Sequence, residues 1–201
     1  MSNETKRDLK ISFFVGTIAG ILLLPTLNNI GVTLNLQRSI LAVLSLIVLT
    51  PSGYLVAYWL SGWIPVMIQF IKFAIVGGLN AMIDLGILNL LIYSTGIVSG
   101  FYYSIFKSVS FLAAVTNSYF WNKHWTFRAG DAPATIEFLK FFLVNLVGFG
   151  INVGAASIVV NIIGVPAGIS GELWANIGAV SAVFISLFWN FIGMKFIVFK
   201  K

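Results

Sequence analysis

Two ionisable residues stand inside apolar stretches of this sequence. Asp84 lies within residues 70–95, and Lys107 lies within residues 101–122. An ionisable side chain costs roughly 2.5–3.5 kcal/mol at the bilayer centre on insertion scales, so such residues are functional candidates by default. A carboxylate and an ammonium group at similar depth in neighbouring helices predict a polar site that contacts a sugar or a phosphate. The alternatives are a static pair that fixes helix register, or a lysine that reaches the outer headgroups.

Asparagines extend this polar set. Asn80, Asn117 and Asn152 are all predicted within apolar helices. An amide offers both the donors and the acceptors that sugar hydroxyls need. Hydrogen bonds between membrane helices use the same groups and contribute about 0.6 kcal/mol on average. A structural role therefore competes with substrate binding at each of these positions.

Basic residues form a second candidate site at one predicted edge of the membrane. Clustered Lys and Arg side chains between helices suit lipid phosphate headgroups. The alternative is the ordinary excess of basic residues on the cytoplasmic side. Trp125, which stands among them, could stack on a sugar ring or anchor the chain at the interface. The basic candidates are Lys72, Lys123, His124, Arg128, Lys140 and Lys195, and we favour Lys123 and Arg128.

The elements that position these residues are predicted to be membrane helices. Of the 201 residues, 59% are hydrophobic and only 9% are charged, against roughly 25% charged residues in soluble domains. The mean hydropathy is +0.98. We therefore expect an all-α, polytopic integral membrane protein with about six transmembrane helices. The predicted spans are residues 9–24, 39–60, 70–95, 101–122, 138–163 and 172–196.

Several classes of function are excluded or disfavoured by composition. The chain has no cysteine, so it forms neither disulfides nor thiolate metal sites. One histidine and six acids give no credible metal cluster. We find no Ser/His/Asp arrangement, no paired catalytic carboxylates and no nucleotide fingerprint. The sequence thus predicts a protein that is not an enzyme and needs no cofactor or metal.

The basic excess predicts an orientation rather than nucleic-acid binding. With six spans and a cytoplasmic N-terminus, ten of the twelve Lys and Arg residues fall on the cytoplasmic side. Both termini are therefore expected in the cytoplasm, and the chain is expected in the cytoplasmic membrane. The net charge of +6 is explained by insertion, so nucleic acid is not an expected partner.

The last four predicted spans contain an internal repeat. Residues 69–73 (QFIKF) recur as residues 137–141 (EFLKF), and at the same offset Asp84 corresponds to Asn152. The ends also correspond, with residues 122–127 (NKHWTF) matching residues 194–199 (MKFIVF). Each copy holds two spans, so both copies have the same orientation, which predicts a pseudo-two-fold axis along the membrane normal. We divide the chain into a two-helix extension, residues 1–66, and a four-helix domain, residues 67–201.

The order of these motifs resembles the GtrA-like family. The resemblance rests on F-x-K-F-x-x-V-G-G at residues 70–78, Asp84, and F-x-N-K-x-W-x-F at residues 120–127, and it covers about residues 67–201. The second copy departs from the pattern, since Met194 stands where the first copy has Asn122. The first copy is therefore the better candidate for binding a polar substrate.

The resemblance implies a function in lipid-linked sugar metabolism. Members of the family are implied in moving polyprenyl-phosphate-linked sugars across the cytoplasmic membrane for cell-surface polysaccharide glycosylation. Others form the membrane part of polyprenyl-phosphate glycosyltransferases. There are two alternatives. The protein could anchor or regulate a separate glycosyltransferase, or it could export a small metabolite in a process coupled to ions through Asp84. Because a four-span bundle has little interior, we also expect a homo-oligomer, most simply a dimer.

Overall fold

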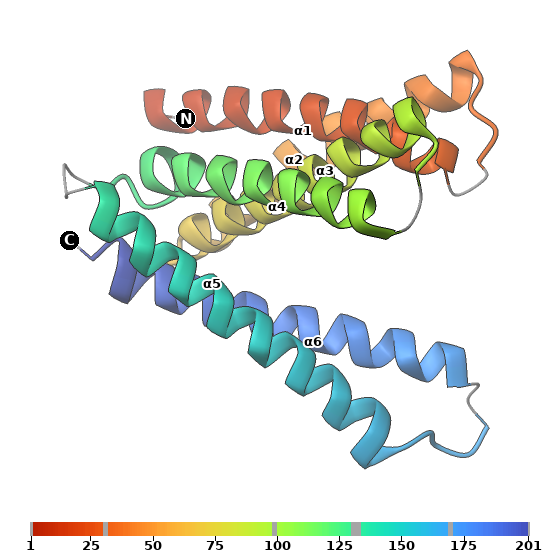
Figure 1. Ribbon diagram of the computed structural model, residues 1–201. Coiled ribbons are helices and arrows are strands. Elements are labelled where there is room, and N and C mark those ends of the chain that lie inside the picture. The colour runs from red at the N-terminus through yellow and green to blue at the C-terminus, as the bar shows by residue number, and fades with distance from the viewer. Residues whose placement is uncertain (1, 30–31, 98–99, 130–133, 169–170, 201) are drawn as a thin grey trace. The chain divides into compact units, whose positions relative to one another are not determined.

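The computed structural model describes residues 2–29, 32–97, 100–129, 134–168 and 171–200 (Figure 1). Every element in these ranges is helical, so the predicted all-α class is confirmed. Each predicted span coincides with a helix, and the predicted spans 138–163 and 172–196 each include a π-helical end. The elements are α1 (Asn3–Asn29), α2 (Leu36–Leu60), α3 (Met67–Thr95), α4 (Gly100–Trp121), η1 (Asn122–Thr126), α5 (Ala134–Ser157), η2 (Ile158–Ile163), α6 (Gly171–Gly193) and η3 (Met194–Val198).

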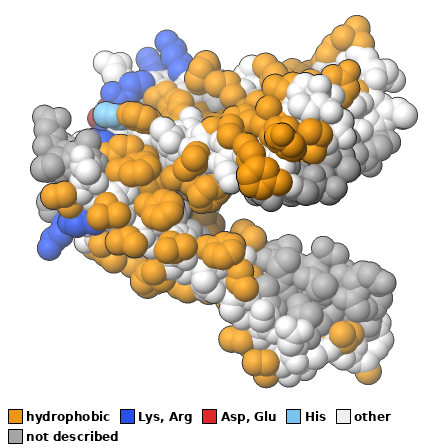
Figure 2. All heavy atoms as spheres, in the orientation of Figure 1, with side chains coloured by type: hydrophobic (Ala, Val, Ile, Leu, Met, Phe, Trp, Pro, Cys, Tyr) orange, Lys and Arg blue, Asp and Glu red, His pale blue; other side chains and the backbone are white. Residues whose placement is uncertain are grey.

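The surfaces of these helices suit a bilayer. Among the described residues, five helices are long and apolar enough to cross a membrane, namely α1, α2, α3, α5 and the second half of α6 with η3. The helix α4 is not among the five, since its 22 residues include Lys107, Asn117 and several serines. Large apolar side chains are exposed along the helices, such as Leu49, which is 64% exposed. In Figure 2 the visible Lys and Arg side chains lie near helix ends, and the flanks are mostly hydrophobic.

The chain divides into two compact units, Met1–Thr126 and Phe127–Lys201. The first unit holds α1 to α4 with η1, and the second holds α5, η2, α6 and η3. In the first unit α1 packs against both α2 and α3, and α4 packs against α3. The predicted division at residues 66 and 67 followed the internal repeat, and it stays a prediction. In space, the two N-terminal helices belong with the first copy of the repeat.

Glycine allows α1 to approach α2 closely. A Cβ atom added to Gly16 would clash with the carbonyl oxygen of Leu46, and one added to Gly20 would lie 2.8 Å from the Cα atom of Val43. Two glycines four residues apart form the small-xxx-small pattern that brings membrane helices together. Thr50 adds a polar link, because its hydroxyl lies 2.8 Å from the carbonyl oxygen of Ser12. The α1–α2 pair is therefore fixed by backbone contact.

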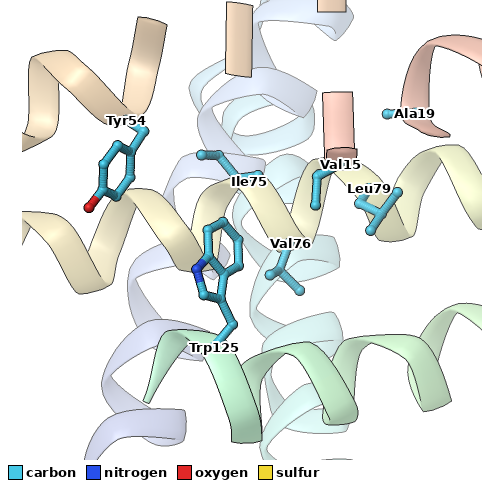
Figure 3. Packing of buried hydrophobic residues seen from close by; sticks show 7 residues of the cluster. All are labelled: Val15, Ala19, Tyr54, Ile75, Val76, Leu79 and Trp125. Atoms are coloured by element: carbon cyan, nitrogen blue, oxygen red, sulfur yellow. The ribbon is translucent and has the colours of Figure 1, made fainter. Parts of the chain in front are cut away.

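The core of the first unit lies where α1, α2, α3 and η1 meet (Figure 3). Its buried members are Val15, Ala19, Tyr54, Ile75, Val76, Leu79 and Trp125. The indole of Trp125 extends from η1 toward α3 in this view. Predicted here as a sugar-stacking or interface residue, Trp125 is only 3% exposed. An aromatic side chain that follows the fourth helix thus joins a core built by α1, α2 and α3.

The two copies of the repeat share a local feature that supports their pairing. The matched motifs at residues 122–127 and 194–199 both form π-helical turns, η1 and η3. Matched residues at the copies' starts are also buried alike, since Phe73 and Phe141, and Val76 and Val144, all belong to the core of their own unit. Each copy is thus a helix pair that ends in a π turn. The symmetry axis between the copies stays a prediction.

Candidate functional site

Polar side chains of α3 and α4 meet along one line, here named the first polar seam (Asn80, Asp84, Ser110, Asn117 and Trp121). Ser110 donates from its hydroxyl to Asp84 Oδ1 over 2.6 Å. Asn117 donates from Nδ2 to Asn80 Oδ1 over 2.7 Å. The indole of Trp121 donates to Asn117 Oδ1 over 3.1 Å. The sequence-predicted residues Asn80, Asp84 and Asn117 are therefore brought together.

Helical spacing explains why these residues share one line. Asn80 and Asp84 are four residues apart on α3, and Asn117 and Trp121 are four residues apart on α4, so each pair lies on one face of its helix. Asn80, Asp84 and Asn117 are half-buried. The seam can therefore offer amide donors, amide acceptors and a carboxylate to hydroxyl groups of a ligand.

The predicted partner of Asp84 is Lys107. Lys107 belongs to α4, but its side chain lies outside the described part of the structure. The predicted pair of Asp84 and Lys107 therefore stays a prediction. What the structure adds is Ser110, a hydrogen-bond donor to the carboxylate that sequence patterns did not single out.

The second unit contains a comparable contact between its own two helices. Asn152 on α5 donates from Nδ2 to the hydroxyl of Ser186 on α6 over 3.1 Å. The indole of Trp189 donates to the carbonyl oxygen of Val144 over 3.2 Å. Asn152 is the repeat counterpart of Asp84, and both side chains bind a serine of the following helix. The second copy thus keeps the hydrogen bond and lacks the charge.

A second polar group, here named the Asp8 cluster (Asp8, Tyr54, Lys72 and Trp125), lies in the interior of the first unit. Asp8 on α1 forms an ion pair with Lys72 on α3, and each side chain is only 4% exposed. The same carboxylate accepts hydrogen bonds from the Tyr54 hydroxyl at 3.2 Å and from the Trp125 indole at 3.0 Å. Donors from α2, α3 and η1 thus converge on one carboxylate.

Aromatic rings enclose the cation of this cluster. The ammonium nitrogen of Lys72 lies 6.0 Å from the centre of the Tyr54 ring and 5.7 Å from that of Trp125. These distances are within the range of cation–π attraction. Lys72, which the sequence predicted as a ligand for a phosphate headgroup, is therefore held in this structure by Asp8, Tyr54 and Trp125.

Sequence reasoning missed Asp8 because it stands among Lys6, Arg7 and Lys10, which suggested a solvated basic flank. The structure begins α1 at Asn3, several residues before the predicted start. A signal for Asp8 was present in the helical spacing of its neighbours. The buried stripe of α1 contains Thr5, Asp8, Ser12, Val15 and Ala19. An acid in register with buried apolar residues predicts an internal partner for that acid.

Two further candidates, Asn122 and Lys123, belong to η1 in the first unit. Lys123 places its ammonium nitrogen 3.3 Å from the Tyr119 hydroxyl and over the ring of the same residue. Asn122 is 1% exposed and donates to the carbonyl oxygen of Ser118 over 2.9 Å. Its Oδ1 atom has no hydrogen-bond partner among the described residues. Asn122 is thus a buried amide whose carbonyl oxygen can accept a hydrogen bond from a ligand.

The remaining basic candidates are His124 of η1, in the first unit, and Arg128, Lys140 and Lys195, in the second unit. Lys140 is exposed on α5, although it is the repeat counterpart of the buried Lys72. Arg128 is half-buried and follows η1 with a backbone φ of 49°, a left-handed conformation that is uncommon for residues other than glycine. The predicted basic cytoplasmic rim that would receive a lipid phosphate stays a prediction.

The helices and their polar seams define a multi-pass membrane protein with hydrogen-bonding groups between its helices. Residues 72–199 match the family described as GtrA/DPMS, transmembrane domain. This match covers more than half of the chain, which therefore belongs to that family. The chain is also similar to an uncharacterized membrane protein, YngA, of Bacillus subtilis strain 168. The two are 33% identical over 81 residues, which are 40% of this chain and 51% of the relative, so the match spans about half the relative's length.

The family match divides the Asp8 cluster between two parts of the sequence. Lys72 and Trp125 belong to the matched region, and Asp8 and Tyr54 precede it. The helices before the family domain therefore supply an anion and a hydroxyl group to residues of the domain itself.

Proposed function

We propose that the protein moves a polyprenyl-phosphate-linked sugar across the cytoplasmic membrane for glycosylation of a cell-surface polysaccharide. Membership of the GtrA/DPMS family supports this substrate class. The observation that carries the proposal is the first polar seam, where Asn80, Asp84 and Asn117 lie half-buried between two apolar helices. Hydroxyl groups of a sugar could exchange hydrogen bonds with these side chains while the lipid tail stays in the bilayer.

The candidate residues take different roles in this proposal. Asn80, Asp84, Lys107 and Asn117 line the route of the sugar, with Asn152 as the corresponding group of the second copy. Asn122 offers a buried acceptor at the cytoplasmic end of the route, and Trp125 stands beside it. The basic residues Lys123, Arg128 and Lys140 attract the phosphate.

The proposed cycle needs no chemistry from this chain. Transport proceeds downhill as the sugar is consumed outside, so that the protein is a transporter and not an enzyme. Both termini lie in the cytoplasm in this scheme. We also expect a homodimer, because two copies would enclose a sugar better than one four-span bundle.

A second candidate function follows from the family description, which covers DPMS as well as GtrA. Here the helices would anchor or regulate a separate polyprenyl-phosphate glycosyltransferase and would not transport. The Asp84-dependent export of a small metabolite is a third candidate.

Reconstitution distinguishes these candidates. Purified protein in liposomes that contain a fluorescent polyprenyl-phosphate sugar should increase the fraction of the lipid that a membrane-impermeant reagent destroys. Liposomes without protein, and liposomes with a fluorescent phospholipid in place of the substrate, are the controls. Equal protection with and without protein would contradict transport and favour the anchoring role.

A further inference from the structure

The Asp8 cluster has the composition of an anion-binding site that is occupied from within the chain. An ammonium group, a phenol hydroxyl and an indole N–H, each from a different element, converge on the carboxylate of Asp8. All three are hydrogen-bond donors in this arrangement, and two oxygens of one anion satisfy them. Lys72 and Trp125 both belong to the family domain, and both bind the side chain of Asp8, which precedes it.

We infer that Tyr54, Lys72 and Trp125 form a phosphate-binding site, and that Asp8 occupies this site as an internal competitor of the substrate's phosphate group. The inference rests on the proposed function for the identity of the lipid. It adds a gate, because the phosphate can bind Lys72 only when the carboxylate of Asp8 withdraws.

Charge and position favour phosphate as the competing ligand. Lysine is a common phosphate ligand, because its ammonium group acts as a point charge that several oxygens can approach. A tetrahedral phosphate can also accept from the hydroxyl and the indole, as the carboxylate does. Asp8 and Lys72 both lie within the first two turns of their helices, close to the depth of lipid headgroups. Lys6, Arg7 and Lys10 on the same helix end would attract anionic lipid to this edge.

The alternative is that Asp8 and Lys72 only hold α1 against α3. The two interpretations differ when the charge of Asp8 alone is removed. Asp8→Asn keeps the side chain's shape and one acceptor oxygen, so α1 can remain in place while Lys72 loses its counterion. A competitor role predicts stronger phosphate binding, whereas a purely structural role predicts unchanged or weaker binding.

The test uses the full chain in nanodiscs of zwitterionic phospholipid, with radiolabelled farnesyl phosphate as the probe. Asp8→Asn should bind the probe at least about tenfold more tightly than the unaltered protein. Adding Lys72→Met to Asp8→Asn should abolish this gain. Glu4→Gln removes the same charge from an exposed position one turn away, and it should leave the affinity unchanged. Farnesol, which lacks the phosphate, should bind all variants alike.

If a variant does not fold, hydrogen exchange of the unaltered protein tests the inference instead. Saturating farnesyl phosphate should increase amide hydrogen exchange in residues 3–12, because displacement of Asp8 releases the start of α1, and farnesol should not. Unchanged affinity in folded Asp8→Asn, a gain that survives Lys72→Met, or unchanged exchange at saturation would each overturn the inference. If the reconstituted protein flips the lipid-linked sugar but Asp8→Asn leaves the affinity for farnesyl phosphate unchanged, this inference alone is rejected. Enhanced binding without flipping would instead reject the proposed transport.

Discussion

The carboxylate of Asp8 and the ammonium group of Lys72 form an ion pair in the interior of the first unit, with each side chain only 4% exposed. The pair joins the first helix of the chain to the first helix of the family domain. Because a buried ion pair has lost its hydration, removal of Lys72 takes a buried cation away from the carboxylate of Asp8. Arg7, whose Nε atom lies 4.0 Å from Asp8 Oδ1, is 58% exposed and so compensates the carboxylate less well.

Loss of Lys72 alone should therefore destabilise the protein strongly. We expect Lys72→Met to lower the free energy of unfolding by about 3–5 kcal/mol. The double variant with Asp8→Asn should recover part of this loss, since neither charge of the pair remains. Thermal unfolding in detergent, followed by circular dichroism, measures both effects. Lys10→Met, at an exposed position of α1, is the control and should unfold like the unaltered protein. Equal stability of Lys72→Met and Lys10→Met would show that the ion pair of Asp8 and Lys72 does not stabilise the fold.

The first polar seam can be tested through Asn117, which bonds to both Asn80 and Trp121. Asn117→Leu should reduce flipping at least about tenfold, while the free energy of unfolding should change by only about 1 kcal/mol, because such bonds contribute little to stability. Asn145 is a matched control, since its amide donates to Phe141 of its own helix. Asn145→Leu should transport normally. If both variants transported equally well, the seam would have no role in the substrate's route.

The charge of Asp84 can be separated from its hydrogen bond by comparison with Asn152, which binds a serine without a charge. Asp84→Asn should keep the contact to Ser110 and fold, but it should lose most of its flipping activity. If Asp84 also pairs with Lys107, adding Lys107→Met should restore any lost yield without restoring transport. Recovery of transport together with yield would instead indicate a purely structural pair. Yield by fluorescence-detected chromatography and flipping in liposomes provide the two readouts.

The fold was largely predictable from the sequence, and the site was predictable in part. The helices follow from long apolar stretches, and the seam follows from Asn80, Asp84 and Asn117, polar residues that apolar helices must satisfy internally. The Asp8 cluster was not predicted, because its donors come from α2, α3 and η1, and no local pattern reveals which distant residues meet. Lys72 illustrates the limit, since its position in the repeat matches the exposed Lys140, yet burial by α1 and α2 gives it a different environment.

The contact of α1 with α2 depends on glycine. Gly16→Leu should destabilise the protein by about 1–3 kcal/mol or more, because the added side chain meets the backbone of Leu46, which cannot move alone. Gly77→Leu is the control, since a Cβ atom added at Gly77 would have open space around it to a distance of 4 Å. Thermal unfolding in detergent should separate the two variants. Similar melting temperatures would show that α1 and α2 are not held by close packing.

The proposed orientation can be tested by cysteine labelling, because the chain has no cysteine of its own. Ser2→Cys and Lys200→Cys should resist a membrane-impermeant maleimide in intact cells, because both termini are expected in the cytoplasm. Thr33→Cys, between α1 and α2, should react from outside. All three should react after the cells are opened. Labelling of Ser2→Cys in intact cells would reverse the orientation.

The long sequence separation within the Asp8 cluster bears on the biogenesis of the protein. Tyr54 follows Asp8 by 46 residues and Trp125 follows it by 117 residues. The ribosome therefore delivers the acid before its donors, and the nascent α1–α2 hairpin, close-packed through Gly16 and Gly20, contains Asp8 and Tyr54 before Lys72 and Trp125 have been synthesised. The cluster closes only after α4 has been synthesised. A first unit that ends before η1 therefore lacks the indole donor to Asp8 and should hold the start of α1 less firmly.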